Sequence, residues 1–599
     1  MNLVISDEPM IGALSSNQFN CTFINYDMAD VISVNKYIDD NSIRLRKKYI
    51  TFIDKIGEKK LGNETIIDFL KLYDDYSFWF SGSLKEKSIY KQNYSDAIKL
   101  MALEEIITSN KCTKISINIS NFNLANEIKE LCKAHKISCS RTLKIRLKNI
   151  FYIKKNNIIF MILRSLKSLI YLAKRKFSHD ASIDIQKGFL FIAPLTYLNT
   201  EIINDKLIFK SNLWDGIPEL LEFNNENANF LHIYSPHDQI KNETEASNII
   251  NSLNKTNKSN HFLVDSNLSF KVKIKIFWRW LETCIRFLLK KHNNKLFCLS
   301  SSKINFYNLL KENYLDTIIG PNLIYNLFIY HYSKKHIELI KNQKKIFYLF
   351  ENQGWENIFS SMVSYVSDKT KFAVPHSTVR FWDLRHFSKI SNKNDEFNTN
   401  PNFYLLNSSA AKEQYISAEI DPSKILECEA LRYRQKPNLS NVNKSNSVLI
   451  FLDYSKKYTN EMMKFLQNFE NKYPGRRKFV FKCHVNCPIE LKNYDFMHAK
   501  IFEGPIEDAL NHHKICFCSN MTSAQVDAYM FGLKIIVFNN SEELNMSPLT
   551  DSKDVIFLNT LSAFLNSTSN INDIENCPHE FFYTNKKLEK WSSILFDKV

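Results

Sequence analysis

Two short polar motifs lie close together in the chain and have residue types suited to binding a phosphate group and a nucleoside. The first follows the apolar run Phe479–Phe481 and supplies a cation and an imidazole, Lys482 and His484. The second follows the apolar run at 515–518 and supplies three hydroxyl groups and a carboxylate, from Ser519, Thr522, Ser523 and Asp527. Cations and hydroxyl groups are the usual donors to phosphate oxygens.

The elements around the second motif predict how these residues are positioned. A strand, a hydroxyl-rich turn, a helical stretch, Gly532 and a further strand form one βαβ unit. Thr522 and Ser523 fall where the helix begins, and free N–H groups and the helix dipole favour an anion there. In a parallel sheet, Lys482 and His484 end a neighbouring strand and face the same region. The alternative is a capped helix beside two ordinary strand ends.

Residues 350–387 carry the densest polar cluster of the chain. Glu351 follows one expected strand, and His376, Arg380 and Arg385 follow the next. Burying a carboxylate, an imidazole and two guanidinium groups is costly unless they meet partners or a ligand. The two arginines are suited to gripping a phosphate or carboxylate, so we interpret the cluster as functional, with a structural polar cluster as the alternative.

Strands and helices alternate along most of the chain, which predicts parallel sheets covered by helices. The first half has expected strands at 2–6, 114–119, 136–139, 188–194, 230–234 and 296–300. The second half has them at 346–350, 372–375, 403–406, 448–452, 479–483, 515–518, 535–538 and 555–558. A Lys-rich stretch separates the two halves, so we expect domains at 1–335 and 345–580. The amphipathic segment 581–599 is expected to pack back on the first domain.

Two stretches of the first half combine basic residues with a broad apolar face, at about 151–177 and at Lys273–Lys291. Such helices lie in the interface of a membrane. The alternative is a pair of core helices whose basic side chains reach solvent. Two stretches of this kind favour an anionic membrane surface as a partner.

The composition limits the class of protein. The chain has 599 residues, a formal net charge of +16 and a pI near 9.0, which favours an anionic partner. We expect no signal peptide and no membrane-spanning helix, so the 12 cysteines are expected to be free thiols in a reducing cytosol. The spacing of Cys483, Cys487, Cys516 and Cys518 is unsuited to zinc, and we expect no metal site. The absence of P-loop and GxGxxG motifs argues against an NTPase or a dinucleotide oxidoreductase.

Several motifs resemble those of a family of bacterial surface-carbohydrate (lipopolysaccharide and capsule) biosynthesis proteins within the GT-B glycosyltransferases. The matching segments are Trp79-Phe80-Ser81 with Glu86-Lys87, Glu351-x-Gln353-Gly354-Trp355-Glu356, His376-Ser377-Thr378 with Arg385, Leu431-Arg432-Tyr433, Thr522-Ser523 with Asp527-Ala528, and Ser547-Pro548-Leu549. Lys482 and His484 with Thr522-Ser523 are also similar to motifs that hold the CMP phosphate in sialyltransferases and Kdo transferases. Val485 stands where those enzymes have proline.

The resemblance implies an α/β GT-B fold, with two Rossmann-like doubly wound domains facing across a cleft. It implies transfer of a sugar, such as a nonulosonic acid or Kdo from a CMP-sugar, to a lipid-linked surface glycan at the cytoplasmic face of the plasma membrane. It also implies no cofactor and no metal. The first domain would supply the catalytic base, Glu86 or else Asp215, and Glu351 and His376 would orient the substrates. A surface ion pair of Glu86 with Lys85 or Lys87 is the structural alternative. The alternative functions are a nucleotide-sugar epimerase and a basic nucleic-acid-binding protein.

Overall fold

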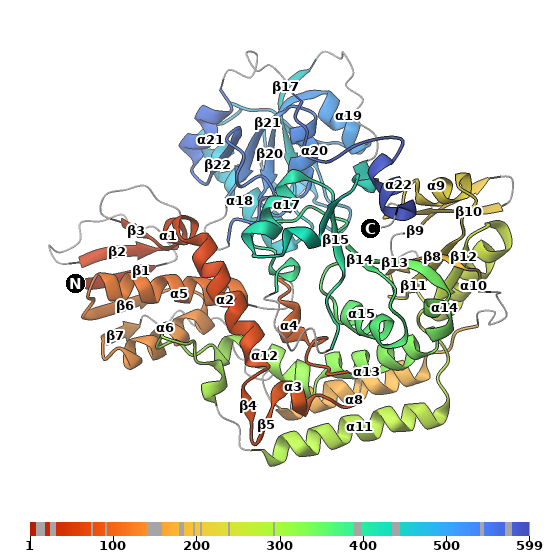
Figure 1. Ribbon diagram of the computed structural model, residues 1–599. Coiled ribbons are helices and arrows are strands. Elements are labelled where there is room, and N and C mark those ends of the chain that lie inside the picture. Colours follow the sequence, from red (N-terminus) through yellow and green to blue (C-terminus); the bar gives the residue numbers. More distant parts are fainter. Residues whose placement is uncertain are drawn as a thin grey trace.

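The computed structural model of this protein contains three open parallel β-sheets that are covered by helices (Figure 1). We refer to them as the N-terminal, middle and C-terminal sheets. The structure describes residues 1–6, 18–23, 31–73, 76–89, 93–141, 158–178, 185–195, 198–203, 206–211, 213–237, 240–290, 294–388, 397–433, 444–539, 544–569 and 578–597. The expected α/β class with Rossmann-like sheets is confirmed, and the structure has one sheet more than the two expected.

Five strands form the N-terminal sheet, at the left of Figure 1. In spatial order they are β3 (Val31–Ser33), β2 (Gln18–Thr22), β1 (Asn2–Ser6), β6 (Lys114–Asn118) and β7 (Ser138–Arg141). The accompanying helices are α1 (Val34–Asp40), α2 (Ser42–Ile56), α3 (Ile66–Phe69), α4 (Ser83–Glu86), α5 (Tyr94–Ser109) and α6 (Phe122–Ala134). A short hairpin of β4 (Lys60–Leu61) and β5 (Glu64–Thr65) follows α2.

Seven strands form the middle sheet. In spatial order they are β12 (Asn260–Leu263), β11 (Ala228–Ile233), β8 (Gly188–Pro194), β13 (Gln343–Leu349), β14 (Lys371–Val374), β15 (Phe403–Leu406) and β16 (Ile425–Glu427). The chain starts at β8, moves outward through β11 and β12, and then returns to the other side at β13. A hairpin of β9 (Leu198–Ile203) and β10 (Lys206–Ser211) lies outside the sheet.

Helix α8 (Ile158–Lys174) precedes β8. The helices between the strands of the middle sheet are α9 (Ile217–Phe223), α10 (Glu243–Thr256), α11 (Phe270–Leu289), α12 (Tyr307–Ile318), α13 (Pro321–Lys334), α14 (Ile337–Lys341), α15 (Gly354–Val366) and α17 (Ser409–Ser417). Residues Asn294–Phe297 form a 3₁₀ turn, so the strand expected at 296–300 is wrong. The flanking chain at Cys298 makes only an isolated bridge with Asn305.

Six strands form the C-terminal sheet, at the top of Figure 1. In spatial order they are β19 (Ala499–Ile501), β18 (Phe479–Lys482), β17 (Ser445–Phe451), β20 (His513–Ser519), β21 (Lys534–Phe538) and β22 (Val555–Leu558). Its helices are α18 (Lys456–Lys472), α19 (Ile506–Asn511), α20 (Ala524–Met530) and α21 (Leu561–Ser567). Alternate residues of β17 enter two separate apolar cores, so helices cover both faces.

The sheet topology corrects the domain boundary expected at residues 335–345. Strand β13 pairs with β8, so a single sheet contains residues from both sides of that boundary. The sheets change instead between β16 and β17. The terminal helix α22 (Glu589–Phe596) returns to the middle sheet, where Trp591 contacts Phe347 and Phe596 contacts Phe189.

A row of five phenylalanine rings crosses the middle sheet. Phe230, Phe191, Phe347, Phe372 and Phe403 occupy paired positions on five neighbouring strands. Successive ring centroids are 5.4, 5.1, 4.7 and 5.6 Å apart, and the rings are nearly parallel. Cross-strand aromatic pairs stabilise a sheet in one register, because a slip of one residue would move each ring to the opposite face.

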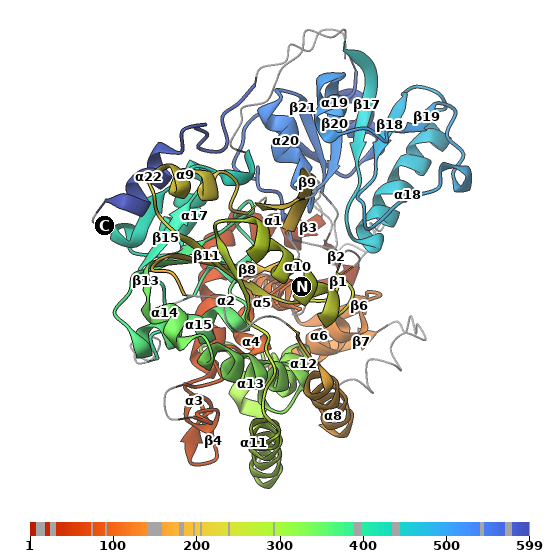
Figure 2. The same ribbon diagram turned by 90° about the vertical axis from the view of Figure 1, so that its right-hand side faces the viewer.

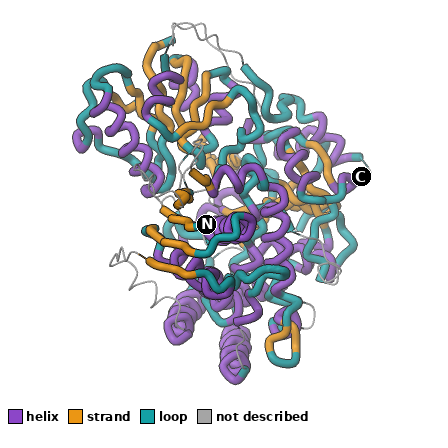
Figure 3. Tube along the Cα trace, turned by 90° about the vertical axis from the view of Figure 1, so that its left-hand side faces the viewer, coloured by secondary structure: helices purple, strands orange, loops and turns teal. Residues whose placement is uncertain are grey.

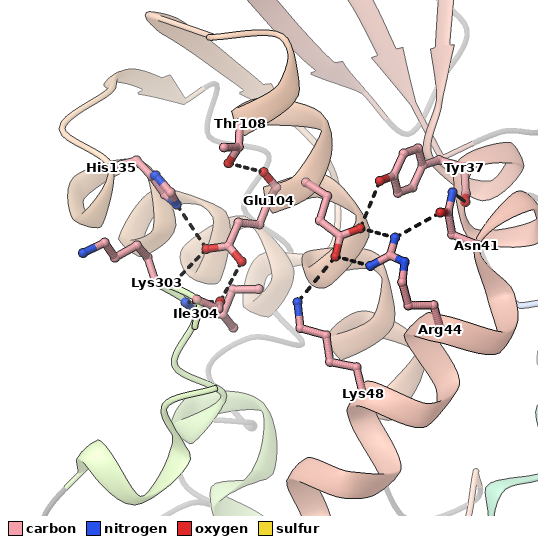
Figure 4. A network of polar contacts seen from close by, with 11 residues as sticks. Tyr37, Asn41, Arg44, Lys48, Glu104, Thr108, His135, Lys303 and Ile304 are labelled. Atoms are coloured by element: carbon pink, nitrogen blue, oxygen red, sulfur yellow. Dashed lines mark hydrogen bonds and ion pairs between the residues drawn. The ribbon is translucent and has the colours of Figure 1, made fainter. Parts of the chain in front are cut away.

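Polar contacts from α5 fasten the N-terminal sheet to the segment before α12 (Figure 4). The buried Glu104 accepts hydrogen bonds from His135 at 3.1 Å and from the backbone N–H of Lys303 at 2.8 Å. The next residue, Glu105, accepts two hydrogen bonds from Arg44 of α2, at 2.7 and 2.6 Å. A continuous apolar core joins the N-terminal and middle sheets.

The Phe347→Ala substitution should lower the free energy of unfolding by about 3–5 kcal/mol, because it removes the central ring of the row and leaves a cavity. Phe347 is fully buried, whereas Phe223 on α9 has an exposed fraction of 86%. Urea denaturation followed by circular dichroism measures the effect, and Phe223→Ala serves as the matched control. Equal midpoints for the two variants would contradict the role given to the row.

Candidate active site

Glu351 follows β13 in a loop held by its own side chains. Its backbone N–H donates to both carboxylate oxygens of Glu356, at 2.9 and 3.1 Å. The side chain of Gln353 donates to Glu351 Oε2 at 2.9 Å. Between them, Asn352 adopts a left-handed conformation with φ of 54°. Burial raises the pKa of Glu356 well above its ordinary value.

The close approach of this loop to Ser81 and to Asn326 of α13 requires a glycine at position 354. A Cβ atom on Gly354 would lie 2.5 Å from Asn326 Oδ1 and 2.7 Å from the Ser81 carbonyl oxygen. Asn352 also donates to the carbonyl oxygens of Lys85 and Glu86, at 3.2 and 3.4 Å. The Trp79-Phe80-Ser81 and Glu351–Glu356 motifs therefore lie together.

His376 comes next to Glu351 because of the strand register. Leu349 pairs with Val374, so the residues two positions further along occupy equivalent places at the strand ends. His376 Nδ1 lies 3.7 Å from Glu351 Oε1. Burial lowers the pKa of His376 although Glu351 opposes this change, so the imidazole is neutral at physiological pH.

Arg385 lies between two carboxylates. It donates to both oxygens of Asp383, at 2.9 and 2.7 Å, and its third nitrogen lies 3.4 Å from Glu351 Oε2. Burial alone would raise the pKa of both acids, but Arg385 outweighs it, so both pKa values fall below their ordinary values. Burial lowers the pKa of the adjacent His386 to about 4. Arg385 thus serves two internal carboxylates, and its binding of a donor phosphate stays a prediction.

Arg380 connects the middle sheet to the C-terminal sheet. It has an exposed fraction of 9%, and its Nη2 donates to Ser523 Oγ at 2.9 Å. Its Nε is buried and meets no hydrogen-bond acceptor among the residues that the structure describes. No described carboxylate lies within ion-pair distance of Arg380, although its charge lowers the pKa of Asp383 and Asp453. A buried guanidinium with a spare donor is a strong anion-binding group.

Asp453 and Ser519 meet at the point where the strand order of the C-terminal sheet reverses. They follow β17 and end β20, and Ser519 Oγ donates to Asp453 Oδ2 at 2.7 Å. Burial raises the pKa of Asp453, and the hydrogen bond from Ser519 opposes this change. Ligands of open α/β sheets bind at such reversal points. Asp453 was not among the residues predicted from the sequence, although an acidic residue soon after an apolar strand is a usable signal.

The Thr522-Ser523 turn is supported from behind. Gln525 is fully buried and donates to the Thr522 carbonyl oxygen at 2.8 Å, while Ser547 Oγ donates to Gln525 Oε1 at 2.6 Å. Ser523 makes no capping hydrogen bond with α20. Its hydroxyl group accepts a hydrogen bond from Arg380 instead. The helix start expected from the sequence is present, but the Ser523 hydroxyl group connects the middle and C-terminal sheets.

Lys482 ends β18 and His484 lies two residues beyond it, and their side chains point in different directions. Lys482 Nζ donates to the Gly504 carbonyl oxygen at 2.6 Å. His484 is exposed, accepts a hydrogen bond from the Asn486 N–H at 3.1 Å and packs edge-on against Tyr454. His484 lies close enough to Asp453 to lower its pKa. The structure therefore brings His484 to the Asp453 region, whereas Lys482 is directed to the neighbouring loop.

Asp527 faces residues that follow the middle sheet. Burial raises its pKa to about 6, against the influence of Arg432 and a hydrogen bond from Tyr433. Arg432 is exposed, and its charge also lowers the pKa of His376. Arg432 thus influences groups of both sheets. In the sequence, Arg432 stands out only as part of the Leu431-Arg432-Tyr433 motif.

The two candidate bases lie in different surroundings. Glu86 ends α4 with an exposed fraction of 7%, next to the loop of Glu351. Its neighbours Lys85 and Lys87 lie 2.6 and 3.7 Å from Asp54, so the two lysines have a carboxylate partner other than Glu86. Asp215 lies before α9, where Trp214 packs on Phe191 within the middle sheet.

The sequence matches no protein-family profile, and no curated protein matches it. Solved structures with a similar fold include the calicheamicin glycosyltransferase CalG4, with 6% identity, coverage of 65% of this chain and 90% of that chain, and a TM-score of 0.36. TarM has 9% identity, coverage of 66% and 93%, and a TM-score of 0.35. The UDP-GlcNAc 2-epimerase from Neisseria meningitidis has 8% identity, coverage of 65% and 94%, and a TM-score of 0.34. No residue role follows from likenesses at this level.

The geometry nevertheless defines what the site can do. The carboxyl ends of β13 and β14 carry Glu351 and His376, and Arg380 joins them to the carboxyl ends of the C-terminal sheet. Facing Rossmann-like sheets of this kind are the GT-B arrangement expected from the sequence. The site offers an ionised carboxylate, a neutral imidazole, hydroxyl groups and a buried cation. It can bind an anion, hold sugar hydroxyl groups and stabilise developing negative charge.

The Arg385→Met substitution should lower the free energy of unfolding by about 3–5 kcal/mol near neutral pH, because it leaves two buried carboxylates without their cation. Both acids have lowered pKa values, so the stability from this pairing is present at neutral pH and is lost as the pH falls through those values. In the variant, burial without Arg385 raises the pKa of both acids, so they take up protons at about pH 4 and the loss should be smaller there. Denaturant titrations at the two pH values, with Arg385→Lys as the charge-conserving control, measure this. Equal losses at both pH values would contradict the assignment.

Proposed function

We propose that this protein is a glycosyltransferase that moves a sugar from a nucleotide donor to a hydroxyl group of an acceptor. The position of Arg380 is the main support for the proposal. Its buried guanidinium joins the carboxyl ends of two Rossmann-like sheets and keeps one N–H without an acceptor among the described residues. A nucleotide-sugar places its phosphate between nucleoside and sugar, so a cation between two sheets is suited to it.

The nucleotide would bind over the C-terminal sheet, beside Asp453 and Ser519, where the strand order reverses. The donor phosphate would meet Arg380, Ser523 and His484. The similarity of the Lys482/His484 and Thr522-Ser523 motifs to those of sialyltransferases and Kdo transferases favours a CMP-sugar as the donor.

The sugar and the acceptor would occupy the side of the middle sheet. Glu351 is ionised and can accept hydrogen bonds from hydroxyl groups, while the neutral His376 can accept or donate one. Glu86 would remove the proton from the attacking hydroxyl group, with Asp215 as the second candidate. Arg380 would stabilise the negative charge that develops on the departing phosphate, so the proposed mechanism uses a side chain where other enzymes use a metal ion.

We further propose that the acceptor is a lipid-linked glycan of a bacterial lipopolysaccharide or capsule, reached from the cytoplasmic face of the plasma membrane. The family resemblance of the motifs supports this choice. A screen of nucleotide-sugars, with glycolipid as acceptor and mass spectrometry of the products, tests the proposal. Conversion of a nucleotide-sugar to its epimer without acceptor would identify an epimerase instead.

The Arg380→Ala and His484→Ala substitutions should each weaken nucleotide binding about tenfold or more, because a hydrogen bond to a charged phosphate contributes about 1.5–3 kcal/mol. Calorimetric titration with a panel of nucleoside mono- and diphosphates measures this effect. Arg476→Ala is the matched control, since Arg476 is an exposed arginine of the same C-terminal unit. Unchanged affinity in both site variants would rule out the phosphate assignment.

The Glu86→Gln substitution should lower kcat by a factor on the order of 10²–10⁴ and leave donor affinity unchanged, because loss of a general base affects the chemical step. Single-turnover kinetics with the identified donor measures this, and Glu58→Gln provides an exposed control in the same unit. Wild-type turnover in Glu86→Gln would make Asp215 the candidate base.

A further inference from the structure

We infer that α8 and α11 together form a docking surface for an anionic phospholipid bilayer. This inference deepens the membrane part of the proposed function by naming the surface and its orientation. Its test needs neither nucleotide nor acceptor, so its failure would leave the glycosyltransferase proposal untouched. We call this surface the docking face and define it by the exposed side chains of Ile158–Lys174 and Phe270–Leu289.

The buried sides of the two helices are fastened to the same backbone group. Ser165 of α8 and Trp280 of α11 both donate to the carbonyl oxygen of Ile319, each at 2.9 Å. Both helices lie at the end of the molecule opposite the C-terminal sheet (Figure 1). Figures 2 and 3 show them nearly end-on from two sides, projecting together from that end.

The outer sides of these helices are apolar. Of the 19 large hydrophobic side chains that are exposed in the described part of the chain, five belong to α8 and six to α11. The most exposed of these eleven are Leu289, Phe270, Ile159 and Trp278, with exposed fractions of 82, 78, 66 and 60%. On α11, Ile274, Trp278, Ile285 and Leu289 follow helical spacing and form a continuous stripe. Concentration of exposed apolar groups on one face indicates an interaction surface.

The charges beside this stripe identify the partner. The two helices contain eight lysines and arginines and a single carboxylate, Glu282. Lys167, Lys271 and Lys275 are exposed to solvent. A protein partner with a matching apolar face would require a complementary acidic rim, whereas an anionic bilayer supplies apolar chains and phosphate groups in adjacent layers. No helix in the described part of the chain is long and apolar enough to span a membrane.

A hollow beside the start of α11 extends the positive surface. Ser269, His331, Lys334 and Lys335 line it. Burial, together with the nearby positive charges of Lys275 and Lys334, lowers the pKa of His331 to about 4, which is a sign of a positive local field. A headgroup phosphate fits such a hollow at the edge of the docking face.

Tryptophan fluorescence gives a direct test, because Trp278 is exposed and the other six tryptophans of the chain are buried. The full-length protein should bind vesicles of phosphatidylcholine and phosphatidylglycerol, bind pure phosphatidylcholine more weakly, and be partly released by salt. Lipids brominated in the acyl chains should quench the fluorescence of Trp278. Trp278→Phe should still bind and should lose the quenching. Binding without quenching in the wild-type protein would overturn the proposed insertion.

Variants separate the apolar and charged contributions. Trp278→Ser with Leu289→Ser should weaken vesicle binding at least about tenfold, because two large apolar side chains no longer enter the bilayer. Lys167→Glu with Lys271→Glu and Lys275→Glu should reduce binding to anionic vesicles by a similar factor. The matched control, Phe223→Ser with Tyr365→Ser, changes two exposed rings elsewhere on the protein and should bind as the wild type.

Three outcomes would overturn the inference. The first is unchanged vesicle binding in both docking-face variants. The second is self-association of the protein without vesicles, measured by light scattering and abolished by the same substitutions, which would make a second copy the occupant. The third is release of the protein from vesicles by millimolar inorganic phosphate that is as effective as release by added competitor anionic vesicles. This result would identify a soluble phosphate as the ligand.

Discussion

The register of the middle sheet is the constraint on which the candidate site depends. Five phenylalanine rings from five adjacent strands stack in one row, and Trp591 of the terminal helix packs against the central ring. Because side chains alternate between the faces of a sheet, this row fixes which residues leave each strand at its carboxyl end. Glu351 and His376 therefore come within 3.7 Å of each other, two positions beyond the last paired residues of β13 and β14.

Two arginines that look alike in the sequence have different environments in the structure. Arg385 is surrounded by Asp383 and Glu351, and the three groups hold the ends of β13 and β14 together. Arg380 donates to a neutral hydroxyl group of the other sheet and keeps a buried N–H without an acceptor in the described residues. The first arrangement fixes the position of Glu351, and the second leaves capacity for an anion.

The sequence predicted most strands, because the buried strands of a parallel sheet are nearly continuous apolar runs that end in polar residues. It also predicted the turn at Thr522 and Ser523 and the polar cluster after β13 and β14. It could not show that β13 joins β8, because strand pairing depends on partners far along the chain. For the same reason it gave two domains where three sheets exist. The contact of Arg380 with Ser523 spans 143 positions and has no local signal.

The order of strands in the middle sheet has a consequence for folding. Strand β8 becomes central only when β13 reaches it, and the hydrogen bond from Asn229 to Gln343 closes a span of 114 positions. Lys345 then bonds to the carbonyl oxygen of Asp597 across 252 positions, after the entire C-terminal sheet has intervened. Contacts so distant in sequence form slowly, since the chain pays the entropy of closing each loop first. During synthesis, the apolar strand β8 therefore emerges long before its partner β13, and one of its edges stays unpaired until β13 arrives, which exposes it to wrong pairing and aggregation.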